Sequence, residues 1–458
     1  GHHLYKFYLY HVSDGVPMWV AACIALAFVL ASAAATAARS GERDDVACRS
    51  DFFAHLADLR RTVASLAAPI GIDGLPVERQ QLLTRTWFNE ASRLQSICSE
   101  WGGRYVGIRG ELPRELAMLQ NGVGQSLYFG LCVPVTCSNS VTGDSLAAHS
   151  LQAFLTLDSV PYLRGVNASK PLVEELASWS AVPIDFAIVG FGKSGTTSLA
   201  MYLARHPDVH LLNPGSSPFF EEPFLAMPDL LPSRAAIDEI MQGINSSSNV
   251  KIGIKYPHLI FNDLALMKLY AANPSVILIV LVRDPIDWIE STYRFYNVLN
   301  VRPPSFRDHI FHVQEDLHQR NMLRAHGLEV LFTYWIRRLS TFGFSREQVY
   351  ALHLDVLDAL AAWRLCSKIG VRGLHLGVFP QANVNTKSIF DLCKATREDP
   401  DIAHTIADLR CNLQDECNEL PGLLAENGEE SPPQLLMRRS RCDIEAALSS
   451  NFGYSSQY

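Results

Sequence analysis

The chain has 458 residues, of which 48% are hydrophobic and 19% are charged. This is the composition of a globular protein large enough for two or three domains, and it excludes a disordered or collagen-like chain. The net charge of −8 argues against a nucleic-acid-binding protein, and the mean hydropathy of +0.07 argues against a transporter with many membrane spans.

An uncharged apolar segment occupies residues 16–38, after a short N-terminal tail at 1–15. Because about 20 apolar helical residues cross the hydrocarbon core of a bilayer, this segment predicts a transmembrane helix that anchors the protein in a membrane. Trp19 fits an interfacial aromatic position. A cleaved signal peptide is the alternative, because the alanines at 33–35 offer a small-residue cleavage site.

The chain contains ten cysteines but no C-x₂-C pair, so its sequence supports no zinc ribbon and we expect no metal. Behind a membrane anchor, the cysteines are better explained as disulfides in an oxidising lumen. We expect Cys132 and Cys137 to be oxidised, with Cys48 and Cys98 as the other two members of two disulfides, and all three connectivities of these four cysteines stay open. Cys366, on a predicted helix, is the candidate for a free cysteine.

Residues 39–165 are predicted to form a small, mostly helical, cysteine-containing domain, because Leu56, Leu59 and Val63 recur roughly at helical spacing. The stretch at 128–138 resembles the cysteine signature of the nose-resistant-to-fluoxetine N-terminal domain. That domain is a lumenal module found ahead of membrane acyltransferases. An unrelated helical stem with two disulfides is the alternative.

The pattern changes in the C-terminal part, which we assign to one domain at 180–458. Apolar runs predict strands at 186–190, 250–254 and 276–282, and helices are predicted at 196–205, 262–272 and 286–299. The last of these strands is a continuous apolar run, as expected of a buried parallel strand. Alternating strands and helices predict an α/β fold in which helices flank a parallel sheet.

A glycine-rich segment at 190–198 follows the first of these strands and opens a helix. Glycines let the backbone approach an anion closely, and the free N–H groups at a helix start point toward it. Lys193 adds a positive charge, and the other candidate ligands are Ser194, Gly195, Thr196, Thr197 and Ser198. The segment therefore predicts a cradle for phosphate or sulfate. It is not a Walker A loop, because Ala187 stands where that motif needs glycine, which disfavours a nucleotide kinase or NTPase.

The order Lys-Ser-Gly-Thr-Thr-Ser at 193–198 resembles the 5′-phosphosulfate loop of sulfotransferases, whose donor is PAPS (3′-phosphoadenosine 5′-phosphosulfate). The run at 278–293 resembles the family's LRDPxxRxxSxY element, which implies that Arg283 and Ser291 bind the 3′-phosphate of the donor. Ligands of a parallel sheet lie at the carboxyl ends of its strands, so Arg283 is expected at the same edge as Lys193. The arginine fork suits a phosphate, which it can bind bidentately.

Further segments match the family in the same order. Residues 253–257 resemble its GEKTP strand end, which implies that Lys255 lies at the sulfate. Residues 331–349 resemble the helix and turn before a late strand, and 385–387 resemble the N-x-T-K region. Residues 397–400 resemble a loop that closes over the donor, with Arg397 matched and Asp399 in place of a histidine. The resemblance covers about 180–410 and looks closest to the membrane-anchored, heparan-sulfate-type branch.

The general base of the family, a glutamate ahead of two aromatic residues, has no plain counterpart. Aligning the aromatic pair at 219–220 puts Ser216 in its place, and serine cannot act as the base there. An alignment with a short insertion makes Glu222 the base, and we prefer it. His258, shortly after Lys255, is a further candidate.

The resemblance implies an enzyme, a lumenal Golgi sulfotransferase that moves a sulfuryl group from PAPS to a hydroxyl or amine of a glycan or another secretory-pathway acceptor. Its catalytic residues would be Glu222, Lys193 and Lys255, and Asn167 and Asn245 would be glycosylation acceptors. The alternative is a sulfotransferase-like subunit with impaired catalysis and an interaction role in a membrane assembly, because the base is in doubt.

Overall fold

A computed structural model of the protein describes residues 48, 50–51, 64–65, 77–111, 126–137, 167–212, 224–227, 229–242, 244, 250–298, 305–319, 331–354, 357, 359–371, 398–413, 420 and 423. The predicted membrane segment at 16–38 lies outside these residues. Within them, none of the helices has the length and apolar character that a membrane span requires.

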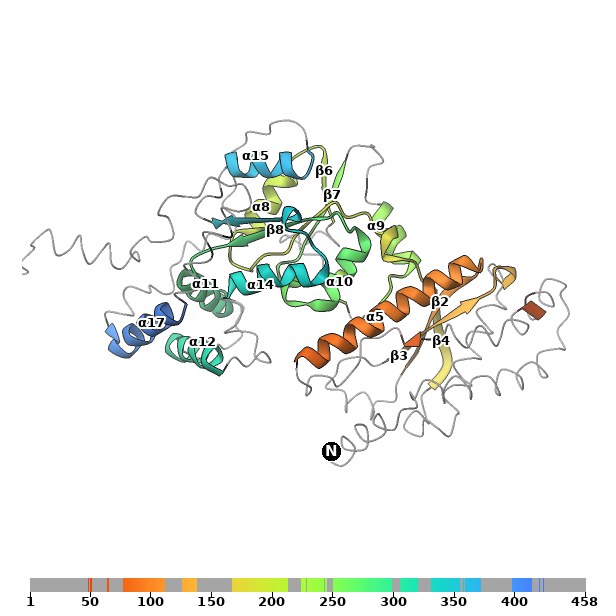
Figure 1. Ribbon diagram of the computed structural model, residues 1–458, viewed down its shortest axis with the longest axis horizontal. Helices are drawn as coiled ribbons and strands as arrows, with labels where there is room; N and C mark the ends of the chain where they lie inside the picture. Colours follow the sequence, from red (N-terminus) through yellow and green to blue (C-terminus); the bar gives the residue numbers. More distant parts are fainter. Residues whose placement is uncertain are drawn as a thin grey trace, which may run out of the picture. The chain divides into compact units, whose positions relative to one another are not determined.

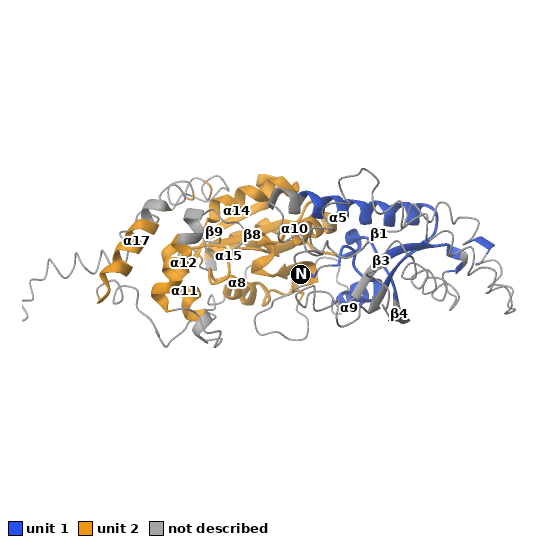
Figure 2. Ribbon diagram, turned by 90° about the horizontal axis from the view of Figure 1, so that it is seen from below, with its two compact units in different colours: residues 1–182, 227–244 blue, residues 183–226, 245–458 orange. Residues whose placement is uncertain are grey.

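The chain divides into two compact units (Figure 2). Unit 1 comprises residues 1–182 and 227–244, and unit 2 comprises residues 183–226 and 245–458. The chain therefore passes from unit 2 into unit 1 at residue 227 and returns at residue 245.

Unit 1 contains a four-stranded antiparallel sheet in the order β1-β3-β2-β4. Strands β2 and β3 pair along their whole length, from Arg104 opposite Val133 to Glu111 opposite Ser126. The bounds of the elements are β1 Ala64–Ser65, α5 Val77–Glu100, β2 Arg104–Glu111, β3 Ser126–Val133, β4 Asn167–Glu175, η5 Trp179–Ala181 and α9 Arg234–Gln242.

This sheet was not predicted from the sequence, and the residues whose spacing indicated a helix, Leu56, Leu59 and Val63, lie outside the described residues. In β2 the side chains of Tyr105, Val106 and Ile108 are all buried, so the strand lacks the simple alternation that marks a half-buried strand. Two glycines and two arginines in the same eight residues make the segment look like a loop in the sequence. The helical prediction is correct for α5, which packs against β2 and β3.

Two disulfides, Cys48–Cys137 and Cys98–Cys132, cross-link the chain within unit 1. The prediction that these four cysteines pair among themselves is confirmed, and the structure selects one of the three connectivities. Cys366 is a free cysteine, as predicted, and it is buried in unit 2. Burial raises the pKa of its thiol to about 11.

Unit 2 is an α/β unit built on a five-stranded parallel sheet, which confirms the predicted fold class. The strand order is β6-β7-β5-β8-β9, so β5 lies in the centre. The bounds of the strands are β5 Phe186–Ile188, β6 Val209–Leu211, β7 Lys251–Lys255, β8 Ile277–Val282 and β9 Val349–His353.

Helices flank this sheet, with α8 and α15 on one side and α10 and α14 on the other (Figure 1). The predicted helices after β5, β7 and β8 are present as α8, α10 and α11. The bounds of the helices are α8 Thr196–Leu203, α10 Asp263–Ala272, α11 Pro285–Val298, α12 Phe306–Gln319, α14 Phe332–Arg338, α15 Ala359–Lys368 and α17 Pro400–Asn412. Short 3₁₀ helices complete the unit as η7 Phe224–Ala226, η8 Pro257–Phe261, η9 Leu339–Phe342 and η10 Arg346–Gln348.

One core of unit 2 lies between the sheet and the α8–α15 pair. Alternate strand residues face these two helices, as the period of a strand requires. The core residues of the strands include Phe186, Ile188, Ile279, Leu281, Tyr350 and Leu352, and those of the helices include Leu199, Leu203, Ala362 and Leu365. This packing fixes the start of α8 relative to the ends of the central strands.

Candidate functional site

The strand order brings three predicted segments to one edge of the sheet. Strand β5 lies between β7 and β8, and Ile188 at its end is in register with Lys255 and with Ile279. The loop after β5, Lys255 at the end of β7 and Arg283 after β8 therefore share the carboxyl edge. The chain leaves β5 toward β6 and leaves β8 toward β9, in opposite directions along the sheet. Ligands of open α/β sheets bind at such a switch point.

The segment at 190–195, called the phosphate loop here, has two residues in the left-handed region. Lys193 has a φ of 67°, and Gly195, the N-cap of α8, has a φ of 86°. A Cβ at Gly195 would lie 2.6 Å from Leu354 Cδ1, so the leucine side chain would have to shift to accommodate it. Glycine is favoured there because an L-residue rarely adopts this backbone conformation.

The hydroxyl side chains around the start of α8 are directed into the protein. Ser194 is fully buried, and its Oγ has no hydrogen-bond partner in the described part of the chain. Thr196 and Ser198 are also buried. A buried polar atom without a partner is rare and costly, and a bound group that supplies an acceptor removes this cost. The start of a helix also attracts anions through its free N–H groups.

Lys255 is fully buried, which is unusual for a lysine. Its Nζ donates a hydrogen bond to Thr197 Oγ1 at 3.2 Å, so the ammonium group lies at the first turn of α8. The predicted convergence of Lys255 on the phosphate loop is therefore present. A lysine in this place puts positive charge beside the group that the loop would bind.

Arg283 connects β8 to the phosphate loop. Its Nη1 donates to the carbonyl of Lys193 at 3.1 Å, while its Nη2 lies 3.8 Å from Asp287 Oδ2. The Nε atom is buried and has no hydrogen-bond partner among the described residues. The next residue, Asp284, caps α11 by accepting hydrogen bonds from the N–H groups of Ile286 and Asp287.

The helix α11 presents several side chains to the loop. Lys193 Nζ lies 4.3 Å from the ring centroid of Phe295, and Trp288 donates a hydrogen bond from Nε1 to the carbonyl of Gly192 at 2.7 Å. Ser291 stands three residues after Trp288 and four before Phe295, so helical spacing puts it on the same face. The predicted donor residue Ser291 therefore lies on the side of α11 that faces the loop.

Two predicted residues, the base Glu222 and the donor residue Arg397, lie outside the described residues, as does the alternative Ser216. Their places at the site stay predictions. His258, the further candidate base, is exposed in η8, and its ring contacts those of Tyr256 and Phe261.

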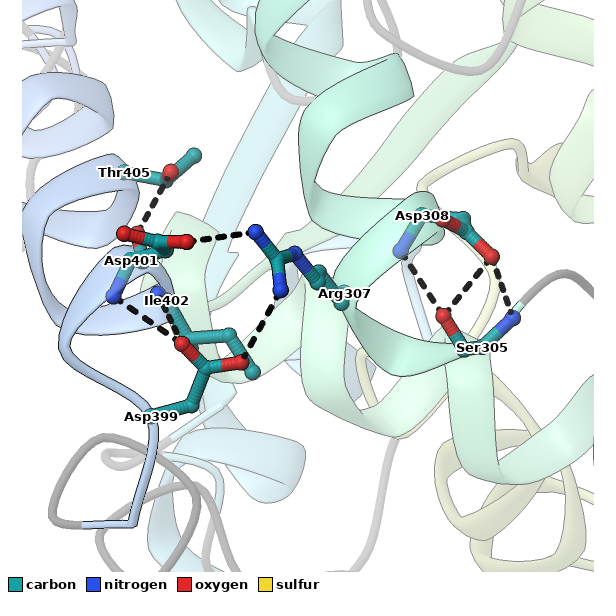
Figure 3. Close-up of polar contacts among 7 residues, drawn as sticks. All are labelled: Ser305, Arg307, Asp308, Asp399, Asp401, Ile402 and Thr405. Carbon is teal, nitrogen blue, oxygen red and sulfur yellow. Dashed lines mark hydrogen bonds and ion pairs between the residues drawn. The ribbon is translucent and has the colours of Figure 1, made fainter.

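The residue in place of the family's histidine, Asp399, has a structural role (Figure 3). Its Oδ1 accepts hydrogen bonds from the N–H groups of Asp401 and Ile402, so it caps α17. Its Oδ2 lies 3.7 Å from Nη1 of Arg307, which also pairs with Asp401. An acidic residue at this position therefore ties the start of α17 to α12.

Sequence reasoning missed the aromatic residues that support the loop. Trp288 and Phe295 contact it from α11, and Phe332 of α14 packs on Phe191 at a centroid distance of 4.3 Å. Of these residues, only Trp288 could have been found from the sequence. It stands in the matched element at 278–293, at a position where the family pattern has an arginine. Aromatic residues on helices otherwise look like ordinary core.

The described part of the chain therefore contains a parallel α/β sheet with a glycine-containing loop, Lys255 and Arg283 at its carboxyl edge. No family model and no curated protein sequence matches the chain. Among solved structures, the chain is similar to a sulfotransferase from Alicyclobacillus acidocaldarius, with 20% sequence identity and a TM-score of 0.40. The similarity covers 53% of this chain and 96% of that chain.

Proposed function

We propose that the protein is a sulfotransferase that moves a sulfuryl group from PAPS to a hydroxyl or amine acceptor. The observation that carries this proposal is the convergence of Lys255 and Arg283 on the phosphate loop from the strands on either side of β5. The buried Oγ of Ser194 and Nε of Arg283 have no hydrogen-bond partner among the described residues, so both could donate to a ligand at this place. The sequence at 193–198 and 278–293 supports the same function through its resemblance to the family.

The loop would hold the 5′-phosphosulfate of the donor. Backbone N–H groups at the start of α8 and the hydroxyls of Ser194, Thr196, Thr197 and Ser198 would donate to it. Arg283 and Ser291 would bind the 3′-phosphate, and Arg397 would cover the donor. A phosphate at Arg283 would engage a guanidinium group that already has a fixed orientation, because it is bonded to Lys193.

In the transfer step, an acceptor oxygen or nitrogen attacks sulfur in line. A bond forms between the acceptor atom and sulfur, the bond from sulfur to the bridging oxygen breaks, and PAP (3′-phosphoadenosine 5′-phosphate) leaves with that electron pair. The acceptor proton passes to Glu222, the proposed base. Lys193 and Lys255 stabilise the negative charge on the transferred group and the bridging oxygen, as cations do in phosphoryl transfer.

We also propose the compartment and the acceptor class. Disulfides favour an oxidising compartment, so a lumenal site in the Golgi, with the chain anchored through residues 16–38, fits the two bridges of unit 1. A glycan is the acceptor that we propose for such a place. The alternative function, a sulfotransferase-like subunit of a membrane assembly, is favoured only by the alignment that puts Ser216 in place of the base.

The test measures donor binding and turnover separately. Calorimetry with PAP should show binding that Lys193→Ala weakens at least about tenfold, the scale of a lost charged hydrogen bond. Arg283→Ala should remove the preference for PAP over the same nucleotide without its 3′-phosphate. Unchanged affinity in Lys193→Ala would refute the loop assignment. Sulfate-labelled PAPS, offered with glycans, tyrosine peptides and lipids, then separates the enzyme from a subunit that binds PAP without turnover.

A further inference from the structure

Trp288 joins the helix α11 to the middle of the phosphate loop. The residue is 3% exposed, and its indole N–H donates to the Gly192 carbonyl at 2.7 Å. Its ring packs edge-on against Phe332 with a centroid distance of 6.5 Å, so the indole has a defined orientation. The bond spans 96 positions of the chain and is therefore a tertiary contact.

The Gly192 carbonyl belongs to the central peptide of a tight turn. The turn is closed by a hydrogen bond of 3.3 Å from the Ser194 N–H to the Phe191 carbonyl. Its third residue, Lys193, has a φ of 67°. A positive φ at this place marks the turn type in which the central peptide is flipped, and glycine or asparagine normally occupies it. A lysine in this conformation is strained, so another contact must hold the flipped peptide.

We propose that Trp288 is a positioning residue that holds the phosphate loop in its anion-binding form. The C=O and N–H of one trans peptide point in opposite directions. An indole that draws the Gly192 carbonyl toward α11 therefore turns the Lys193 N–H to the opposite side. Arg283 holds the next peptide through the Lys193 carbonyl, and the N–H of that peptide, which belongs to Ser194, closes the turn. This inference rests on the proposed function, since the anion concerned is the 5′-phosphate of the donor.

The chain offers a matched control for the test. Trp179 in η5 is 2% exposed, and its indole N–H also donates to a backbone carbonyl at 2.7 Å, that of Leu230 in unit 1. Trp288→Phe and Trp179→Phe therefore remove the same kind of hydrogen bond from equally buried rings. The two variants differ in whether the lost bond holds the phosphate loop.

Trp288→Phe should weaken the binding of PAP by about fivefold to tenfold, the scale of one neutral hydrogen bond, while Trp179→Phe should bind PAP like the wild type. Both variants should lower the thermal midpoint by similar amounts. Hydrogen exchange of the amides at 191–196 should become faster in Trp288→Phe only. Wild-type affinity for PAP in a folded Trp288→Phe would overturn the proposal, whatever the loss of stability.

Two further outcomes keep the inference separate from the proposed function. If the wild type does not bind PAP, the proposed function fails. The hydrogen exchange of the loop amides then decides by itself whether Trp288 holds the turn. Unchanged exchange in Trp288→Phe would count against that role. A further measurement uses the wild type alone, so its result does not depend on whether a variant folds. Saturating PAP should slow the exchange of the Lys193 amide, and unaltered exchange would refute the orientation that we assign to this N–H.

Discussion

Replacing Gly195 by alanine tests whether the backbone of the phosphate loop sets the stability of unit 2. Gly195 has a φ of 86°, and the left-handed conformation costs an L-residue about 1–2 kcal/mol. The new Cβ would also lie 2.6 Å from Leu354 Cδ1 and 3.3 Å from Leu357 Cδ2. Both atoms are the ends of flexible side chains that can shift, so this overpacking costs about 1 kcal/mol, the low end of the usual range. We therefore expect Gly195→Ala to lower the free energy of unfolding by about 2–3 kcal/mol.

A second glycine of the same loop provides the control. A Cβ at Gly192 would meet nothing within 4 Å, and its φ lies outside the left-handed region. Gly192→Ala should therefore keep the free energy of unfolding within about 1 kcal/mol of the wild type. Urea unfolding, followed through the hydrogen exchange of β5 and α8, measures both variants in unit 2.

The two contributions at Gly195 can be separated. Adding Gly195→Ala to a Leu354→Ala background removes the closest contact, so the loss in that background should fall to about 1–2 kcal/mol, most of it the cost of the backbone conformation. If Gly195→Ala unfolds at the same urea concentration as Gly192→Ala, the reasoning from φ and from the Leu354 contact is wrong.

Three further predictions concern single side chains. Lys255→Met keeps the buried stem and removes the charge, so turnover should fall by about 100-fold or more while PAP, which has no sulfate, binds nearly as before. A parallel loss of PAP binding would assign Lys255 a structural role instead. Glu222→Gln should abolish transfer of labelled sulfate and leave PAP affinity intact, and retained turnover would exclude Glu222 as the base. Cys366 has a pKa raised by burial from 9.0 to about 11, so its contribution to stability is complete below pH 9 and is lost as the pH rises toward 11. Its thiol should react slowly with a thiol reagent at pH 8 in the folded protein and rapidly in urea, and rapid reaction without urea would contradict its burial.

The sequence alone determined the α/β character of unit 2 and the place of its loop. The apolar run at 276–282 and the glycine-rich segment at 190–198 are local signals, because their residues adopt strand and turn structure largely from their own neighbours. The positions of β5, β7 and β8 and of the helices that follow them were predictable for this reason. The restriction of pairing to four cysteines followed from their grouping ahead of the α/β part.

Unit 1 was less predictable because its local signals conflict. Strand β2 mixes glycine, arginine and consecutive buried residues, and its stability comes from pairing with β3 and β4 along the strand. Pairing with strands that are distant in the sequence produces no periodic pattern of residues within a single segment. The mostly helical prediction therefore captured α5 and missed the sheet.

Only the tertiary structure decided which distant groups meet. It selected Cys48–Cys137 and Cys98–Cys132, because pairing depends on how α5 and the sheet bring the thiols together. It placed β5 between β7 and β8, and this order brings Lys255 and Arg283 to the loop from opposite sides. The bond from Trp288 to Gly192 joins residues that are far apart in the chain, and such contacts form only when the packed sheet and α11 fix both partners.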